Sequence, residues 1–182
     1  PEPGEHVVLG APLNGPWPEG TEVIYLAGGC FWGVERILWR QDGVVSTSVG
    51  YMGGETPNPT YQEVCTGTTG HAETVRVVYD PAVCGEGGET LLKTFWENHD
   101  STHLNRHGND IGTQYRSAVW TTTPAQREAA VRIREAFQGE LTRLGLGTCV
   151  TTIEEANSTR LPPVRLEKPT VWVSPMMTET RL

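Results

Sequence analysis

A cysteine between two glycines and two aromatic residues is the feature that most constrains this chain. Residues 27–35 read Ala-Gly-Gly-Cys-Phe-Trp-Gly-Val-Glu. Residues 22–26 before it resemble a buried strand, and residues 31–40 after it space their apolar side chains as a helix does. The pattern predicts a strand-to-helix turn with Cys30 in the first helical turn. Unpaired N–H groups and the positive helix end meet there and favour the nucleophilic thiolate. The alternative is a small buried cysteine beside a core aromatic pair.

The composition is that of one soluble globular domain. The chain has 182 residues, of which 37% are hydrophobic and 20% charged. Its net charge of −8 argues against nucleic acid or an anionic membrane as a partner. The sequence has no apolar run long enough to span a bilayer and no N-terminal signal pattern. We therefore expect a cytoplasmic monomer that binds neither nucleic acid nor membrane.

The four cysteines show no close pairing motif. They stand at positions 30, 65, 84 and 149, a spacing wider than that of usual zinc ligands. They are also too few for a secreted disulfide scaffold. Reduced thiols, no metal and no bound cofactor are the expectation.

The order of predicted elements indicates a mixed sheet with helices packed on it, the α+β class. Residues 1–21 contain five prolines and read as an irregular N-terminal arm. After the first strand and helix, we expect strands over 44–51, 73–79, 117–121 and 149–153, helices over 90–99 and 124–144, and long loops over 53–60 and 100–116.

Three further segments follow the cysteine motif. They read Gly-Gly-Glu-Thr-Pro-Asn-Pro-Thr-Tyr (53–61), Thr-Gly-His-Ala-Glu (69–73) and Gly-Asn-Asp-Ile-Gly-Thr-Gln-Tyr-Arg-Ser-Ala (108–118). Together with Gly-Cys-Phe-Trp they closely resemble the peptide methionine sulfoxide reductase family, type A. The resemblance implies a ferredoxin-like two-layer sandwich with long loops and a reductase domain over 22–155. It also implies thiol-dependent reduction of methionine (S)-sulfoxide, free or in proteins, as a repair of oxidised proteins.

Reducing a sulfoxide requires a nucleophile, a proton for the departing oxygen and hydrogen-bond donors for the charge that develops on it. Cys30 can supply the nucleophile. Glu73 can supply the proton if an apolar site keeps its carboxyl protonated. The phenols of Tyr61 and Tyr115 are neutral donors. The family resemblance assigns the same roles to these four positions.

The resemblance assigns three more residues to the site. The residue matching Asp110 orients the site and helps to bind substrate. Phe31 and Trp32 match the residues that hold the methyl group of the substrate side chain.

Each assignment has a structural alternative. Glu73 would be a solvated carboxylate on an exposed strand face, and Tyr61 would cover the core. Asp110 after an asparagine would be a turn former, and Tyr115 an edge aromatic. His71, between glycine and alanine, is interpreted as a structural hydrogen-bonding residue.

Recycling is the least determined step. Attack leaves Cys30 as a sulfenic acid, which a second thiol converts to a disulfide that thioredoxin or another thiol reduces. The resolving cysteine is unknown, with Cys65, Cys84 in a glycine-rich mobile loop, and Cys149 as open candidates. No pattern pairs any of them with Cys30, so we expect an external thiol to attack the sulfenic acid directly.

The segment 156–182 forms an atypical C-terminal tail. It lacks the aromatic motifs with which the family follows its last strand, either as a lineage-specific tail or as a reading-frame artefact. Two competing functions stay open, and the altered tail motivates the first. One is a catalytically impaired family member that only binds oxidised methionine or a protein partner. The other is a cysteine hydrolase that pairs Cys30 with His71 or His99.

Overall fold

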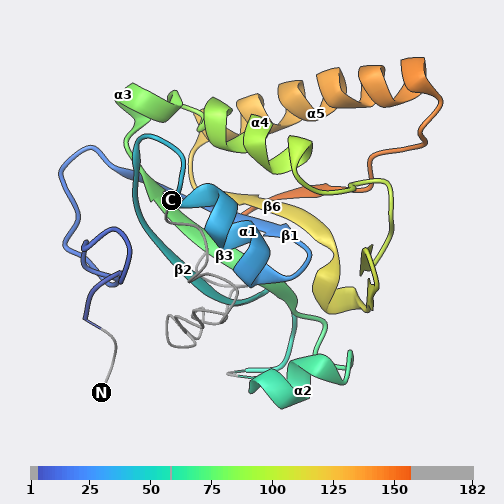
Figure 1. Cartoon of the computed structure of the whole chain (residues 1–182), viewed down its shortest axis with the longest axis horizontal. Helices are drawn as coiled ribbons and strands as arrows, with labels where there is room; N and C mark the ends of the chain where they lie inside the picture. The colour runs from blue at the N-terminus through green and yellow to red at the C-terminus, as the bar shows by residue number, and fades with distance from the viewer. Residues whose placement is uncertain (1–3, 58, 157–182) are drawn as a thin grey trace, which may run out of the picture.

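A five-stranded sheet in the order β2-β3-β1-β6-β7 forms the centre of the computed structural model, which describes residues 4–57 and 59–156 (Figure 1). Its β6–β7 pair is parallel and the other pairs are antiparallel, so the mixed sheet predicted from the sequence is confirmed. The strands are β1 (Glu22–Gly28), β2 (Val44–Met52), β3 (Ala72–Tyr79), β6 (Ser117–Thr121) and β7 (Thr152–Glu155).

Three helices cover one face of this sheet. They are α1 (Phe31–Leu38), α4 (Glu89–Glu97) and α5 (Pro124–Leu144). The apolar side chains of the helices are buried in one core with those of the strands, as Leu91, Phe95 and Ala129 show. The side chain of Thr123 caps α5 by accepting the N–H of Gln126, and Gly145 ends the helix in the left-handed conformation, with φ at +69°.

The opposite face of the sheet carries a smaller apolar cluster of Ala27, Met52, Ala72, Ala118 and Trp120. Residues of the N-terminal arm pack against the sheet nearby. The guanidinium of Arg76 donates to the carbonyl of Leu13 at 2.6 Å and lies 5.3 Å from the centre of the Trp17 ring. Leu13 itself is fully buried, so the described part of the arm packs on the domain.

The loop predicted over 100–116 contains a 3₁₀ turn η1 (Thr113–Tyr115) and a hairpin of β4 (Arg106–His107) and β5 (Asp110–Ile111). Two short helices that were not predicted, α2 (Tyr61–Cys65) and α3 (Pro81–Cys84), follow the loop over 53–60 and strand β3. Strand β7 begins at Thr152 rather than Cys149, because the N–H of Cys149 donates to the Gln138 side chain instead of a neighbouring strand.

The expectation of a mobile loop at Cys84 is wrong. Cys84 is fully buried at the end of α3, and its thiol donates to the carbonyl of Asp42 at 3.3 Å. The glycine that follows Cys84 ends helix α3: Gly85 has φ at +91°, a conformation that favours glycine. Apart from Ala156, the atypical tail over 156–182 lies outside the described residues. None of the helices in the described part of the chain combines the length and apolarity needed to cross a bilayer.

The strand register brings distant segments to one end of the sheet. Gly28, the last residue of β1, pairs with Ser117, the first of β6, and Met52 at the end of β2 pairs with Ala72 at the start of β3. The same end of the sheet therefore carries three segments: the connection after β1, the connection between β2 and β3, and the segment before β6. Figure 1 shows α2 projecting from the ends of β2 and β3.

Candidate active site

Cys30 is the N-cap residue of α1, one position before the predicted first turn. Its backbone has φ −55° and ψ 116°, and its carbonyl accepts the N–H groups of Gly33 at 3.1 Å and Val34 at 3.3 Å. Gly29 before it has φ at +105°, and a Cβ there would overlap the ring of His107. A glycine is required at position 29 on both counts. The turn thus leaves the thiol of Cys30 half-buried at the helix N-terminus.

Glu73 reaches the same helix end from the sheet. It is the second residue of β3, only 3% exposed, and its Oε2 accepts the backbone N–H of Phe31 at 3.0 Å. Burial raises the pKa of Glu73 to about 7, with a further rise from Asp110 and an opposing effect of the Phe31 N–H. The alternative of a solvated carboxylate is therefore wrong. Near neutral pH this side chain is present in both the acid and the carboxylate form.

The Cys30 thiol is not activated in the way the sequence predicted. Burial raises its pKa, and the Glu73 and Asp110 carboxylates raise it further. The N–H groups of Trp32 and Gly33 act in the expected direction and lower it, but their effect is the smaller one. The free protein therefore favours the thiol, because desolvation and two nearby carboxylates outweigh the helix end.

Two phenols approach from different segments. Tyr61 opens α2, whose start is fixed by a capping box between Thr60 and Glu63. Tyr61 is 43% exposed, and its pKa is raised to about 12, chiefly by a hydrogen bond to the Cys65 side chain. Tyr115 ends η1, and burial, then Glu73, raises its pKa. Both phenols therefore stay protonated at neutral pH and can donate hydrogen bonds.

Asp110 lies on the β4–β5 hairpin, where it pairs with His107. Its carboxylate is exposed, yet it is close enough to raise the pKa values of Glu73, Cys30 and Tyr115. The fold thus brings together five residues predicted from the sequence that lie far apart along the chain: Cys30, Tyr61, Glu73, Asp110 and Tyr115.

The two aromatic residues after the cysteine differ in exposure. Phe31 is 3% exposed and belongs to the core, whereas Trp32 is 44% exposed beside it, with ring centres 5.7 Å apart. Phe31 also contacts Tyr51, with ring centres 5.6 Å apart. The sequence analysis missed Tyr51. The strand period of two would have placed it on the same face as Val49, under α1.

Both histidines considered for a hydrolase already have partners on each ring nitrogen. His71 accepts the N–H of Gly54 at Nδ1, and its Nε2 lies 2.8 Å from the carbonyl of Thr56. The ring nitrogens of His99 lie 2.6 Å from the Phe95 carbonyl and 2.8 Å from the Ser117 hydroxyl. His71 is therefore interpreted as structural, as in the sequence analysis, and the ring nitrogens of both histidines bond to groups other than the Cys30 thiol.

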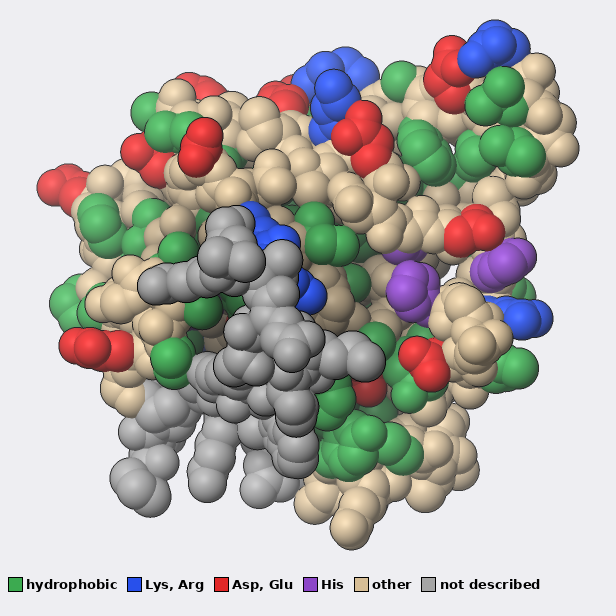
Figure 2. All heavy atoms as spheres, in the orientation of Figure 1, with side chains coloured by type: hydrophobic (Ala, Val, Ile, Leu, Met, Phe, Trp, Pro, Cys, Tyr) green, Lys and Arg blue, Asp and Glu red, His purple; other side chains and the backbone are tan. Residues whose placement is uncertain are grey.

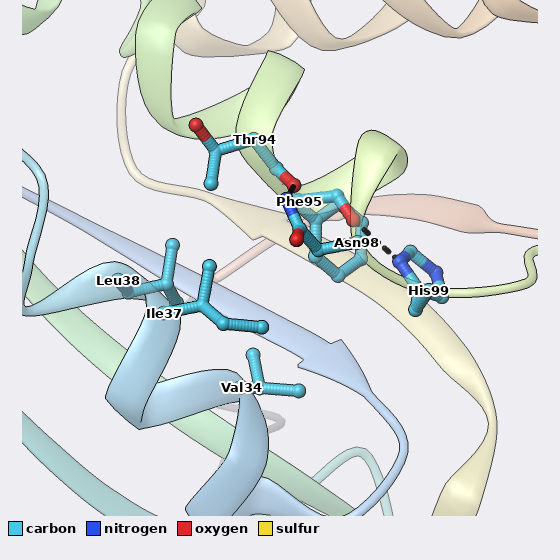
Figure 3. Close-up of a pocket in the computed structure, with 7 residues that line it drawn as sticks. All are labelled: Val34, Ile37, Leu38, Thr94, Phe95, Asn98 and His99. Atoms are coloured by element: carbon cyan, nitrogen blue, oxygen red, sulfur yellow. Dashed lines mark hydrogen bonds between the residues drawn. The ribbon is translucent and has the colours of Figure 1, made fainter. Parts of the chain in front are cut away.

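Two hollows in the structure are lined by none of the five residues that the fold brings together at Cys30. Figure 3 shows the smaller one, between α1 and α4; its volume is about 10 Å³, room for about one water molecule. A groove of about 500 Å³ runs between α4 and α5, lined by Trp96, Ile133 and Phe137 among others. Figure 2 shows both acidic and basic side chains along this edge of the molecule. No cluster of His, Cys, Asp and Glu suited to a metal ion occurs among the residues that the structure describes.

Comparisons with known proteins agree on one family. A family model described as peptide methionine sulfoxide reductase matches residues 22–159. The peptide methionine sulfoxide reductase MsrA of Salinispora arenicola (strain CNS-205) is 56% identical over 153 residues, which cover 84% of this chain and 69% of that protein. The structure of methionine sulfoxide reductase A of Corynebacterium diphtheriae has a TM-score of 0.81 at 46% identity, over 91% of this chain and 77% of that one. The structure of Mxr1 from Saccharomyces cerevisiae in complex with Trx2 has a TM-score of 0.54 at 25% identity. The match covers 78% of this chain and 80% of that one.

Proposed function

This chain belongs to the peptide methionine sulfoxide reductase family, and from that premise we propose that Cys30 reduces methionine sulfoxide by direct attack on its sulfur. The chain is an oxidoreductase of protein repair, as the similarity to named reductases and to their structures supports. The single observation that carries the assignment of residues is the Glu73 carboxyl, buried and hydrogen-bonded to the residue after Cys30.

The chemical step transfers one oxygen atom. The Cys30 sulfur bonds to the sulfoxide sulfur, and the S–O oxygen is protonated. The S–O bond of the substrate then breaks, a hydroxyl oxygen bonds to the Cys30 sulfur as the transient S–S bond breaks, and methionine leaves as the thioether. The products are methionine and Cys30 sulfenic acid, so the cysteine sulfur is oxidised by the two electrons that the substrate sulfur gains. Neither a metal nor a bound cofactor is needed for this balance.

Glu73 is proposed as the proton donor. Its pKa of about 7 lets it hold a proton near neutral pH and release it as the S–O bond breaks. Tyr61 and Tyr115 would donate to the same oxygen as negative charge develops on it. Asp110, which is exposed on the β4–β5 hairpin, is proposed to bind the polar part of the substrate.

The substrate is proposed to be the S epimer, free or in peptides. The methyl group would lie against Trp32 over the buried Phe31, the oxygen against Glu73 and the tyrosines, and the chain toward solvent. Three different surfaces around one chiral sulfur cannot all be satisfied after inversion. The exposed indole of Trp32 supports this arrangement.

Recycling is proposed to use thioredoxin or another thiol, in the reducing cytoplasm. The solved complex of Mxr1 with Trx2 supports a thioredoxin as the reductant. All four cysteines of this chain are free thiols in the structure. Cys84 follows the end of β3 that is opposite to Glu73 and Cys30, about one strand of eight residues away, or roughly 25 Å. Cys149 donates to Thr151 at 3.3 Å.

The direct test is turnover with each epimer of methionine sulfoxide and dithiothreitol as reductant, with methionine measured by chromatography. We expect methionine from one epimer only. Equal rates with both epimers would contradict the assigned site, and no methionine from either would point to the impaired family member instead.

A further inference from the structure

A buried chain of hydrogen bonds connects the N-terminal arm to the helix that begins at Cys30. The His6 Nε2 lies 2.7 Å from Thr47 Oγ1, and the Thr47 hydroxyl donates to Glu35 Oε1 at 2.8 Å. The three side chains are 3%, 1% and 7% exposed for His6, Thr47 and Glu35. The chemistry at Cys30 gives none of them a role.

The direction of this chain follows from the other nitrogen of the imidazole. The backbone N–H groups of Val8 and Leu9 donate to His6 Nδ1 at 3.2 and 3.0 Å. A nitrogen that accepts two N–H groups carries no proton, so the proton of the neutral ring is on Nε2. Nε2 therefore donates to Thr47, whose single hydroxyl proton is left for Glu35. Burial lowers the pKa of His6, which agrees with a neutral ring.

Glu35 lies one helical turn after Phe31, on the same face of α1. The helix therefore has two polar attachments to the sheet: the Phe31 N–H to Glu73 on β3, and the Glu35 carboxyl to Thr47 on β2. Apolar packing is non-directional, whereas two hydrogen bonds a turn apart fix rotation and translation of a helix. The His6 ring also meets Trp39, the C-cap of α1, edge-on with ring centres 5.7 Å apart.

We propose that His6 and Glu35 are positioning residues that hold α1, and with it Cys30, in the geometry needed for attack. The inference rests on the proposed role of Cys30 as the nucleophile. The family model begins at residue 22, so His6 lies outside the matched segment. The irregular arm of residues 1–21 is then part of the catalytic architecture through one side chain.

Two substitutions at His6 separate this role from support of the arm. His6→Asn retains an acceptor near Nδ1 for the turn at Val8 and Leu9 but loses the donor to Thr47. His6→Gln retains a donor near Nε2 but loses that acceptor. We expect kcat to fall on the order of tenfold in His6→Asn with KM unchanged, while kcat of His6→Gln stays close to that of the parent. If His6 only supports the arm, kcat should instead fall in His6→Gln and stay close to the parent value in His6→Asn.

Thr47 offers a second pair that leaves the arm sequence intact. Thr47→Val keeps the shape and removes the relay, and Thr47→Ser restores the hydroxyl. We expect Thr47→Val to match His6→Asn and Thr47→Ser to recover activity. The second readout is the rate at which iodoacetamide alkylates Cys30 in the folded protein, which should change with kcat. Denaturant unfolding reports stability separately.

The outcomes are distinct. Equal kcat values and equal Cys30 alkylation rates across the folded variants would overturn the positioning role while leaving the reductase intact. If one of the variants does not fold, the pair at the other residue decides. Retained activity in Cys30→Ser would instead remove the proposed nucleophile itself.

Discussion

The Glu73 carboxylate accepts the backbone N–H of Phe31 at 3.0 Å, although the two residues stand 42 positions apart in the chain. This bond places an ionisable group with a pKa of about 7 beside the residue that follows Cys30. Hydrogen bonding to an N–H favours the carboxylate, and burial favours the acid. The balance leaves a group that can give up a proton during a reaction near neutral pH.

The pH dependence of the first turnover should report Glu73 directly. The reacting form has Cys30 as thiolate and Glu73 as acid. The rate should rise with pH up to about 7 and then level off, because further gain in thiolate is offset by loss of the Glu73 proton. Glu73→Gln should be far slower but should keep rising above pH 7. The measurement is methionine formed in a single turnover, with Glu97→Gln on the exposed part of α4 as control.

Cys30→Ser should abolish reduction, since a hydroxyl is almost un-ionised and a poor nucleophile toward sulfur. The matched control is Cys149→Ser, because a serine hydroxyl can replace the thiol that donates to Thr151. We expect the control to retain its single-turnover rate. Methionine formation by Cys30→Ser would contradict the mechanism.

Local patterns predicted much of the fold, whereas the residues proposed for the site, apart from Cys30, were selected by the resemblance of their motifs to the family. The turn before α1 and the bounds of the helix predicted over 124–144 each depend on neighbouring residues alone, and both are found. The helix α2 was not predicted, although the sequence contains the residues of its capping box, Thr60 and Glu63. The loop predicted over 53–60 ends directly before this helix.

Other features depend on contacts that no local pattern contains. The raised pKa of Cys30 results from burial and from carboxylates 43 and 80 positions later, at Glu73 and Asp110. The burial of Glu73 itself depends on α1 lying over β3. The bond between His6 and Thr47 spans 41 positions and joins an irregular arm to a strand. Such pairings follow from topology and not from periodicity.

The phenols of Tyr61 and Tyr115 should contribute in parallel to stabilising the departing oxygen. Removing one donor to a developing oxyanion costs on the order of a hundredfold in kcat. We expect each of Tyr61→Phe and Tyr115→Phe to lose about that much or somewhat less, with a larger loss in the double variant. Tyr25→Phe, in β1, is the control and should be unchanged. A full rate in the double variant would remove both residues from the mechanism.

Acid should destabilise the fold through His99. Burial lowers its pKa to about 4 in the folded protein, whereas the unfolded chain binds the proton near 6.5. The unfolded state therefore gains a proton first as pH falls. Stability should decline between pH 6.5 and about 4, by about 2 kcal/mol from this residue between pH 7 and 5. Urea unfolding at the two pH values measures it. The difference should shrink in His99→Gln, and an unchanged difference would contradict the assignment.

The oxidised state of Cys30 after one turnover should be a sulfenic acid rather than an internal disulfide. A disulfide needs Cα atoms within about 7 Å, which excludes Cys84 at the far end of the sheet. Cys149 faces Thr151, and the Cys65 side chain is engaged by the Tyr61 phenol. We expect one equivalent of substrate, without reductant, to give protein whose Cys30 is labelled by dimedone in mass spectrometry. The same treatment of Cys65→Ser should give equal labelling, since Cys65 is the remaining thiol near the site. A peptide linking Cys30 to Cys65, together with stronger labelling in the variant, would instead identify Cys65 as the resolving cysteine.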